Sequence, residues 1–496
     1  MDYLVPSWHK QLVDWAYSTP EIQFDDTVSH MKVFQHHQRK VGLVIMDYLP
    51  QLTTQLSQIA LAPDKIFSLF DYLQDVKGFE NQVVDYLDFD WPDGAIFDYT
   101  NFRLFVVVKG KVYAKITFDT QSKIHSIAYF KDGNIDRRLL MDSRGFISSE
   151  EHEGVETYFS PSGVWRFKRN KETDHVIINN SVFPFCRHSE YAHMQDLLIE
   201  VMQEQFLSEL KSTDNLIVTL DDHMSIPIDI YQKYHPIYSI SHWHQYSGQL
   251  PDKITSKVVF DSQELLQRFN YISNGEVIPL FQSQFKLGHS QRLSQQRIAI
   301  FAENMSHDEL AEMLEQLYPR LIANPLDEAV HIFAYSIEKS SMANQVIREL
   351  HQKHSGEFIL SMNEIDPGEN QIEKEDIPPL LSIKVKRLTS TAEVLRALDK
   401  IRTLIIWNKN DQFMEIAGIS VGIPIIQNFE SIEVMDHKNG IVCDEISNIS
   451  EFVSYYLDSL KHWNESLVHN VKVMNHYSED NIFAKWQAIL ERKVQK

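Results

Sequence analysis

The stretch that decides the fold is Thr403–Asp444, TLIIWNKNDQFMEIAGISVGIPIIQNFESIEVMDHKNGIVCD. Its apolar pattern predicts a buried strand over Leu404–Trp407, a helix over Asp411–Ser420 and a second strand over Pro424–Gln427. Gly422-Ile423-Pro424 provides the stop between the helix and the second strand. A strand, a helix and a strand in this order predict a βαβ unit, and the loops after such parallel strands form the crevice in which α/β sheets bind ligands.

Length and charge narrow the class of protein. A chain of 496 residues is long enough for about three domains. Lys and Arg number 47 against 69 Asp and Glu, which gives a formal net charge of −22. This charge disfavours polyanions, so nucleic acid is not an expected partner. Cys186 and Cys443 match no metal-ligand or redox spacing, and we interpret them as free thiols in a reducing compartment.

The sequence contains no signal for membrane insertion. Its N-terminus lacks a basic region followed by an apolar run, and no segment approaches the roughly 20 apolar residues that span a bilayer. We therefore expect a cytoplasmic protein. Peripheral association with the membrane through a partner stays open.

The chain begins with a second βαβ pattern. Asp2–Val5 predicts a strand, Asp25, Asp26 or Thr27 can cap a helix, and Val41–Met46 predicts the returning strand. Gly42 is the only glycine of this unit, so the dinucleotide fingerprint GxGxxG is missing. No cofactor is expected.

Between about Asp88 and Asn180 the apolar pattern alternates, which predicts antiparallel strands. Glycine-containing turns separate several of these strands. The predicted strands are Phe102–Val108, Val112–Phe118, Ile124–Phe130 and Val164–Lys168, with turns at Lys109-Gly110, Asp132-Gly133 and Ser162-Gly163. Helical periodicity resumes over Tyr191–Leu210, so we interpret the antiparallel segment as an insertion.

From Arg297 onward strands and helices alternate again, which predicts a second doubly wound sheet. Glu364–Glu375 reads as an exposed acidic loop, and the tail predicts amphipathic helices around Glu451–Trp463 and Asp480–Glu491. The fold class is therefore α/β, with two Rossmann-like domains and an inserted antiparallel β domain. The expected domains are residues 1–87 with 186–290, the insertion 88–185, residues 291–475, and a C-terminal helix over 476–496 that packs on the first domain.

Few residues of the sequence are candidates for catalysis, metal binding or ligand binding. His36-His37 and His242-Trp243-His244 are histidine-rich, but the first pair points about 100° apart on a helix and the second set alternates as a strand would. Neither has a partner at zinc-site spacing, so no metal is expected. The sequence has no GxSxG, so no serine nucleophile is expected either. Trp8, directly after the first strand, could stack on a sugar ring.

Two doubly wound domains and the Gly422-Ile423-Pro424 unit resemble glycosyltransferases of the GT-B class. In the nucleotide-sugar enzymes of that class, one glutamate precedes the glycine of Gly-x-Pro by five residues and another stands eight residues earlier. Here those positions hold Ala417 and Lys409. Glu415 is two residues away, about 200° around the helix, and should face elsewhere.

The resemblance also implies an arginine and a lysine after the first strand of the second domain, where they hold the donor diphosphate. Ala302–Glu309 is acidic instead. We therefore expect a GT-B scaffold with no catalytic residues. An active glycosyltransferase that uses Glu415 or Glu303 remains the alternative. Candidate residues of the former cleft are Ser7, Trp8, His9, Asn304, Asn408, Lys409, Ser420 and Gly422.

A closer resemblance runs from end to end of the chain, in a series of short segments. They are MDYLVPSW (1–8), FDDT (24–27), MDYLPQL (46–52), FSLFDYLQDV (67–76), SRGFISS (143–149), SPSGVWRF (160–167) and ISVGIPIIQ (419–427). In this order the segments resemble the first of the Asp proteins of accessory Sec export systems. The resemblance implies a cytosolic, non-enzymatic protein that supports export in Gram-positive bacteria. The partners implied are two other Asp proteins, the accessory motor ATPase and the glycosylated serine-rich repeat adhesin, including its glycan.

Overall fold

A computed structural model describes residues 1–8, 25–77, 81–100, 103–119, 121–182, 186–248, 250, 256–283, 288–360 and 378–491. The chain forms two compact units. Met1–Leu280 and Lys485–Lys496 make up the first unit, and Phe281–Ala484 makes up the second. Among the described helices, none combines the length and the apolar composition needed to cross a bilayer.

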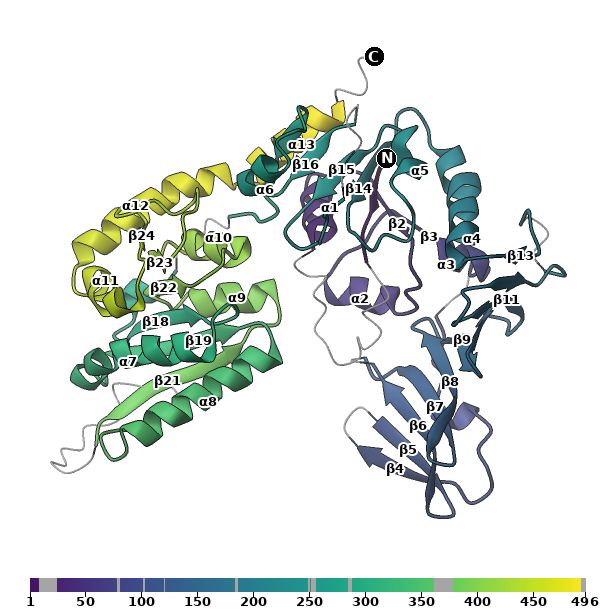
Figure 1. Ribbon diagram of the computed structural model, residues 1–496, viewed down its shortest axis with the longest axis horizontal. Coiled ribbons are helices and arrows are strands. Elements are labelled where there is room, and N and C mark those ends of the chain that lie inside the picture. Colours follow the sequence, from purple (N-terminus) through teal and green to yellow (C-terminus); the bar gives the residue numbers. More distant parts are fainter. Residues whose placement is uncertain are drawn as a thin grey trace. The chain divides into compact units, whose positions relative to one another are not determined.

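The first unit contains a parallel seven-stranded sheet (Figure 1). Its first strand in the sequence, β1 (Asp2–Val5), lies inside the sheet and pairs with β2 on one side and β14 on the other, so the winding reverses between β1 and β14. In spatial order the strands are β17 (Gly275–Val277), β16 (Val258–Phe260), β15 (Ile237–Ile240), β14 (Asn215–Thr219), β1, β2 (Val41–Ile45) and β3 (Lys65–Ser68). The helices are α1 (Asp26–His36), α2 (Leu52–Gln58), α3 (Leu69–Leu73), α4 (Met194–Val201), α5 (Asp229–Gln232) and α6 (Gln263–Arg268).

The second unit repeats this plan with its own parallel sheet. The winding reverses between β18 and β22, and the predicted βαβ unit at Thr403–Asp444 is confirmed as β22, α10 and β23. The strands are β20 (Ile359–Leu360), β21 (Leu380–Arg387), β19 (Glu328–Ala334), β18 (Gln296–Phe301), β22 (Thr403–Ile406), β23 (Ile425–Gln427) and β24 (Gly440–Val442). The helices are α7 (His307–Ala323), α8 (Ile337–Lys353), α9 (Thr391–Leu398), α10 (Gln412–Ser420), α11 (Ile449–Leu457) and α12 (Leu460–His476).

Apolar side chains of α7, α8 and α11 pack into one core with the second sheet. The last helix, α13 (Glu479–Glu491), carries the fully buried Trp486. The Trp486 ring makes edge contacts with His30 and Phe34 of α1, at centroid distances of 4.7 and 5.3 Å. Trp486 thus belongs to the core of the first unit, although it lies near the end of the chain.

The insertion is a ten-stranded antiparallel meander (Figure 1). Four of these strands were predicted. The other six were missed because they are short or carry charged residues that interrupt the apolar alternation. At Asp132-Gly133 both residues have positive φ, 52° and 84°, as a tight hairpin requires. The strands are β4 (Ile96–Thr100), β5 (Arg103–Val108), β6 (Lys111–Phe118), β7 (Ile124–Lys131), β8 (Asn134–Asp142), β9 (Phe146–His152), β10 (Val155–Phe159), β11 (Trp165–Asn170), β12 (Val176–Ile178) and β13 (Glu190–Tyr191).

Two further predictions were wrong. The single helix predicted around Glu451–Trp463 is two helices, because the Ser459 side chain caps α12 and interrupts the pattern. His242-Trp243-His244 does not continue a strand, since the His244 amide donates to the Ser241 carbonyl at 3.3 Å and closes a turn. The predicted acidic loop Glu364–Glu375 lies outside the described residues.

Candidate functional site

The carboxyl ends of β18 and β22 bring several predicted residues together at the reversal point of the second sheet. The side-chain nitrogen of Asn408, Nδ2, donates to the Asn304 backbone carbonyl at 3.1 Å and to both Glu309 carboxylate oxygens at 2.9 Å. Lys409 follows Asn408 and is exposed. Ser420 and Gly422 lie at the other end of α10, next to the start of β23, and so at the opposite edge of the sheet.

Helix N-termini at this edge already hold carboxylates of the protein itself. Glu309 accepts from the Ser306 amide at 2.7 Å and completes the capping box of α7. Glu303 accepts from the Tyr335 and Ser336 amides before α8, at 2.8 and 3.1 Å. Asp411 caps α10, because its carboxylate accepts from the Met414 amide at 2.7 Å. Since a diphosphate would need these same amides, fixed carboxylates repel it.

The alternative donor-site residue Glu415 is fully buried within the second unit. The Ser431 hydroxyl donates to it at 2.5 Å. Burial, reinforced by the nearby charge of Glu433, raises the pKa of Glu415 to about 8. Ala417 is also buried, at 2% exposure. In this structure neither position presents a side chain to a ligand in solvent.

The predicted residues of the first domain lie directly after β1. Ser7 and Trp8 are both 3% exposed, and the Trp8 ring nitrogen has no hydrogen-bond partner in the part of the chain that the structure describes. His9 lies outside the described residues. The two candidate groups are thus on different sheets, after β1 in the first unit and after β18 and β22 in the second.

A polar cluster missed by sequence reasoning lies at the carboxyl edge of the first sheet. His244 Nε2 lies 2.8 Å from Asp25 Oδ2 and 3.4 Å from Asp26 Oδ1, and His244 Nδ1 lies 3.3 Å from Asp221 Oδ2. Burial alone would lower the pKa of His244, but the hydrogen bonds to Asp221, Asp25 and Asp26 hold it well above the usual value. A signal existed, since Asp25-Asp26 and His244 each follow a parallel strand of the same sheet.

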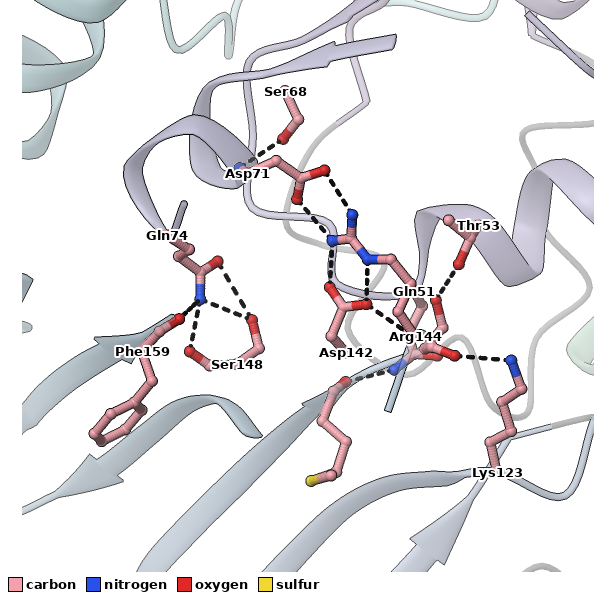
Figure 2. Close-up of polar contacts among 12 residues, drawn as sticks. Gln51, Thr53, Ser68, Asp71, Gln74, Lys123, Asp142, Arg144, Ser148 and Phe159 are labelled. Carbon is pink, nitrogen blue, oxygen red and sulfur yellow. Dashed lines mark hydrogen bonds and ion pairs between the residues drawn. The ribbon is translucent and has the colours of Figure 1, made fainter. Parts of the chain in front are cut away.

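A second group of polar contacts, some buried and some partly buried, joins the insertion to the first Rossmann-like domain (Figure 2). Arg144, between β8 and β9, donates to both carboxylate oxygens of Asp71 in α3 at 2.8 and 2.7 Å. Arg144 also pairs with Asp142, whose side chain is 3% exposed. The side-chain amide of Gln74 donates to the backbone carbonyls of Ser148 and Phe159 at 2.8 and 2.7 Å. These contacts hold the insertion against α3 in one orientation.

Gln51 and Thr53 extend this junction along α2. The Gln51 amide donates to the Met141 carbonyl at 2.7 Å, and the Thr53 hydroxyl contacts the Ser143 hydroxyl (Figure 2). Lys123 donates to the Ser143 carbonyl at 2.8 Å. The junction is therefore built mainly by FSLFDYLQDV and SRGFISS, two of the segments on which the family resemblance depends.

The family model for the first Asp protein of the accessory Sec system matches residues 5–493. The chain belongs to this family. Its relative in Streptococcus gordonii, also described as the first accessory Sec system Asp protein, is 24% identical over 533 residues, which cover 100% of this chain and 99% of that protein. The structure of the Gap123 complex from Streptococcus agalactiae superposes with a TM-score of 0.80 at 24% identity, covering 100% of both chains. Accessory secretory proteins 1, 2 and 3 of Streptococcus pneumoniae give a TM-score of 0.77 at 22% identity, covering 100% of this chain and 99% of that one.

The fold is also that of GT-B glycosyltransferases, as predicted. The pneumococcal O-GlcNAc transferase GtfA superposes with a TM-score of 0.69 at 11% identity, covering 100% of this chain and 99% of that one. At this identity the likeness concerns the fold alone. The chain is thus an accessory Sec system component built on a GT-B-like fold.

Proposed function

We propose that this accessory Sec system protein is a non-enzymatic scaffold that assembles with two other Asp proteins in the cytoplasm and supports export of a glycosylated serine-rich repeat adhesin. Solved relatives support the assembly, since one is a Gap123 complex and another contains accessory secretory proteins 1, 2 and 3. The accessory motor ATPase, the adhesin and its glycan complete the proposed partners. Peripheral membrane association would then come through the partners.

The observation that carries the non-enzymatic proposal is the set of carboxylates at the helix N-termini after β18, β19 and β22. Glu309, Glu303 and Asp411 accept the amides that a donor diphosphate would need. Ser7, Trp8, His9, Asn304, Asn408, Lys409, Ser420 and Gly422 stay our candidates for a remnant ligand site.

Calorimetric titration of UDP and UDP-sugars into the full chain tests this proposal. We expect no binding at micromolar ligand, since the edge presents fixed negative charge. Micromolar binding that Glu415→Ala abolishes would establish the alternative, an active glycosyltransferase. The matched control Glu430→Ala changes an exposed carboxylate nearby in sequence and should leave the titration unchanged.

We further propose that the insertion carries part of the interface with another Asp protein. Among the described residues, β4 is an edge strand whose one partner is β5, and Ile96 and Tyr99 on it are 67% and 63% exposed. An edge with unpaired amides and exposed apolar side chains favours addition of a strand from a partner.

Co-purification of the three Asp proteins tests this interface. Ile96→Lys should weaken capture of a partner about tenfold, the effect of losing a buried interface side chain. Ile135→Lys is the matched control, because Ile135 is 46% exposed but lies on the interior strand β8. Removing the insertion should release at least one partner. Retention of every partner by that deletion variant, with both α/β domains folded, would refute the assignment.

A further inference from the structure

Asp25, Asp26 and His244 place one potential ligand atom each within 4.8 Å of one another. His244 Nε2 lies 2.8 Å from an Asp25 oxygen and 3.4 Å from an Asp26 oxygen. Two ligands that each lie about 2.1 Å from a tetrahedral zinc ion are roughly 3.4 Å apart. The three donor atoms are therefore close to the spacing that a metal ion requires, and one of them is an imidazole nitrogen.

The groups behind these ligands orient them as in metal sites. His244 Nδ1 faces Asp221 Oδ2 at 3.3 Å, and a carboxylate on the second ring nitrogen is typical of metal-binding histidines. The Ser239 hydroxyl donates to Asp26 Oδ2 at 2.6 Å, and the Thr219 hydroxyl contacts both Asp26 oxygens at 3.2 Å. These contacts fix the imidazole and one carboxylate from β14 and β15.

The cluster gathers several buried acidic groups around one imidazole. Asp25, Asp26 and Asp221 are 5%, 0% and 8% exposed, and the His244 side chain is 9% exposed. Within the described residues, the Thr27 and Val28 amides at the start of α1 also donate to Asp25. Buried carboxylates are costly, so a divalent cation in place of the imidazole proton would stabilise this arrangement further.

A buried hydroxyl without a partner lies on the segment that carries His244. Ser241 is 1% exposed, and its Oγ has no hydrogen-bond partner in the described part of the chain. It directly follows β15 and begins the turn that the His244 amide closes on the Ser241 carbonyl. The hydrogen-bonding capacity of this segment is therefore not used up within the described residues.

We propose that Asp25, Asp26 and His244 form a binding site for a divalent transition-metal ion, with zinc as the favoured ion. An imidazole with two carboxylates suits zinc or manganese better than magnesium or calcium, which prefer oxygen ligands alone. The ion would join the N-terminus of α1 to the ends of β14 and β15, at the point where the first sheet reverses its winding. Its role there is structural.

Titration of the full chain, stripped with EDTA and dialysed, tests the site. We expect ZnCl2 to bind with one high-affinity equivalent per chain by calorimetry, and elemental analysis to give the same ratio. His244→Gln and Asp25→Asn should each weaken that equivalent by about 100-fold or more. Asp221→Asn should weaken it by about 10- to 100-fold, the usual effect of losing a group that orients a ligand.

His242→Gln is the matched control, because His242 is a neighbouring histidine that is 35% exposed and pairs with Asp261 instead. It should keep the high-affinity equivalent. Absence of any one-to-one binding by ZnCl2 or MnCl2 to the unaltered chain would overturn the proposal, whatever the variants do. Equal affinity in Asp25→Asn, or loss of the equivalent in His242→Gln, would also overturn it.

Discussion

Arg144 of the insertion and Asp71 of α3 form a bidentate ion pair, with nitrogen to oxygen distances of 2.8 and 2.7 Å. The same guanidinium binds Asp142, so one cation holds two carboxylates. Burial raises the pKa of Asp142 despite its hydrogen bonds to Arg144. Ionised Asp142 therefore depends on Arg144, and the junction depends on both.

The first prediction concerns this cation. Arg144→Ala should lower the free energy of unfolding of the first unit by about 3 kcal/mol, because it removes the guanidinium from the buried Asp142 carboxylate and leaves it the backbone amide of residue 144 as a donor. Urea denaturation followed by tryptophan fluorescence measures the change. The control Arg137→Ala removes a pair with Glu150 whose side chains are 41% and 26% exposed, and should lower stability by less than about 1 kcal/mol. Equal losses in the two variants would contradict the role of Arg144.

The second prediction concerns the glycine next to Arg144. Gly145 has φ +99°, and a Cβ there would overlap the backbone carbonyl of Gln82. Gly145→Ala should therefore destabilise the first unit by more than about 2 kcal/mol, combining backbone strain with a clash against backbone that cannot rotate away. Gly133→Ala is the control, since Gly133 has φ +84° but open space around its Cβ position. If both variants have the same thermal midpoint, the clash is not significant.

Much of the fold followed from the sequence because its signals are local. The buried strands β1 and β22 are runs of apolar residues, and α10 is preceded by Asp411 as its cap. The insertion was harder, since strands such as β8, NIDRRLLMD, carry charges at successive positions and so break the alternating apolar pattern. The break between α11 and α12 was missed because Ser459 interrupts a pattern that is helical on both sides.

The candidate sites show the limit of such reasoning. The sequence alone showed that Ala417 and Lys409 stand where the GT-B enzymes have two glutamates, because this needs only the spacing from Gly422. The cap formed by Glu309 could also have been predicted, because Ser306-His307-Asp308-Glu309 has the spacing of a capping box. The contact of Glu303 with the Tyr335 and Ser336 amides could not, because it joins two loops that are distant in the sequence. His244 had no metal-binding partner at short spacing in the sequence. Its carboxylate neighbours come from residues 25, 26 and 221, which only the parallel sheet brings together.

The third prediction is a pH dependence from Glu415. Its pKa is about 8 in the folded chain against an ordinary value of 4.5, so the folded state binds the proton more tightly than the unfolded state. Stability from this group is present below about pH 4.5 and is lost as the pH rises toward 8. Glu415→Gln keeps the shape and removes the ionisation. The free energy of unfolding of the variant, relative to wild type, should therefore be higher at pH 8 than at pH 5. The expected change is on the order of a few kcal/mol, since each pKa unit corresponds to about 1.4 kcal/mol.

Urea unfolding of the second unit at pH 5, 6, 7 and 8 measures this dependence for both proteins. The difference between the two curves isolates Glu415 from the other titrating groups. Glu430→Gln, which changes an exposed carboxylate, should run parallel to wild type across the whole range. A Glu415→Gln curve that also runs parallel would mean that Glu415 is ionised in the folded protein at neutral pH. The prediction would then be wrong, and the carboxylate would be a buried anion that the Ser431 hydroxyl and its neighbouring side-chain amides stabilise.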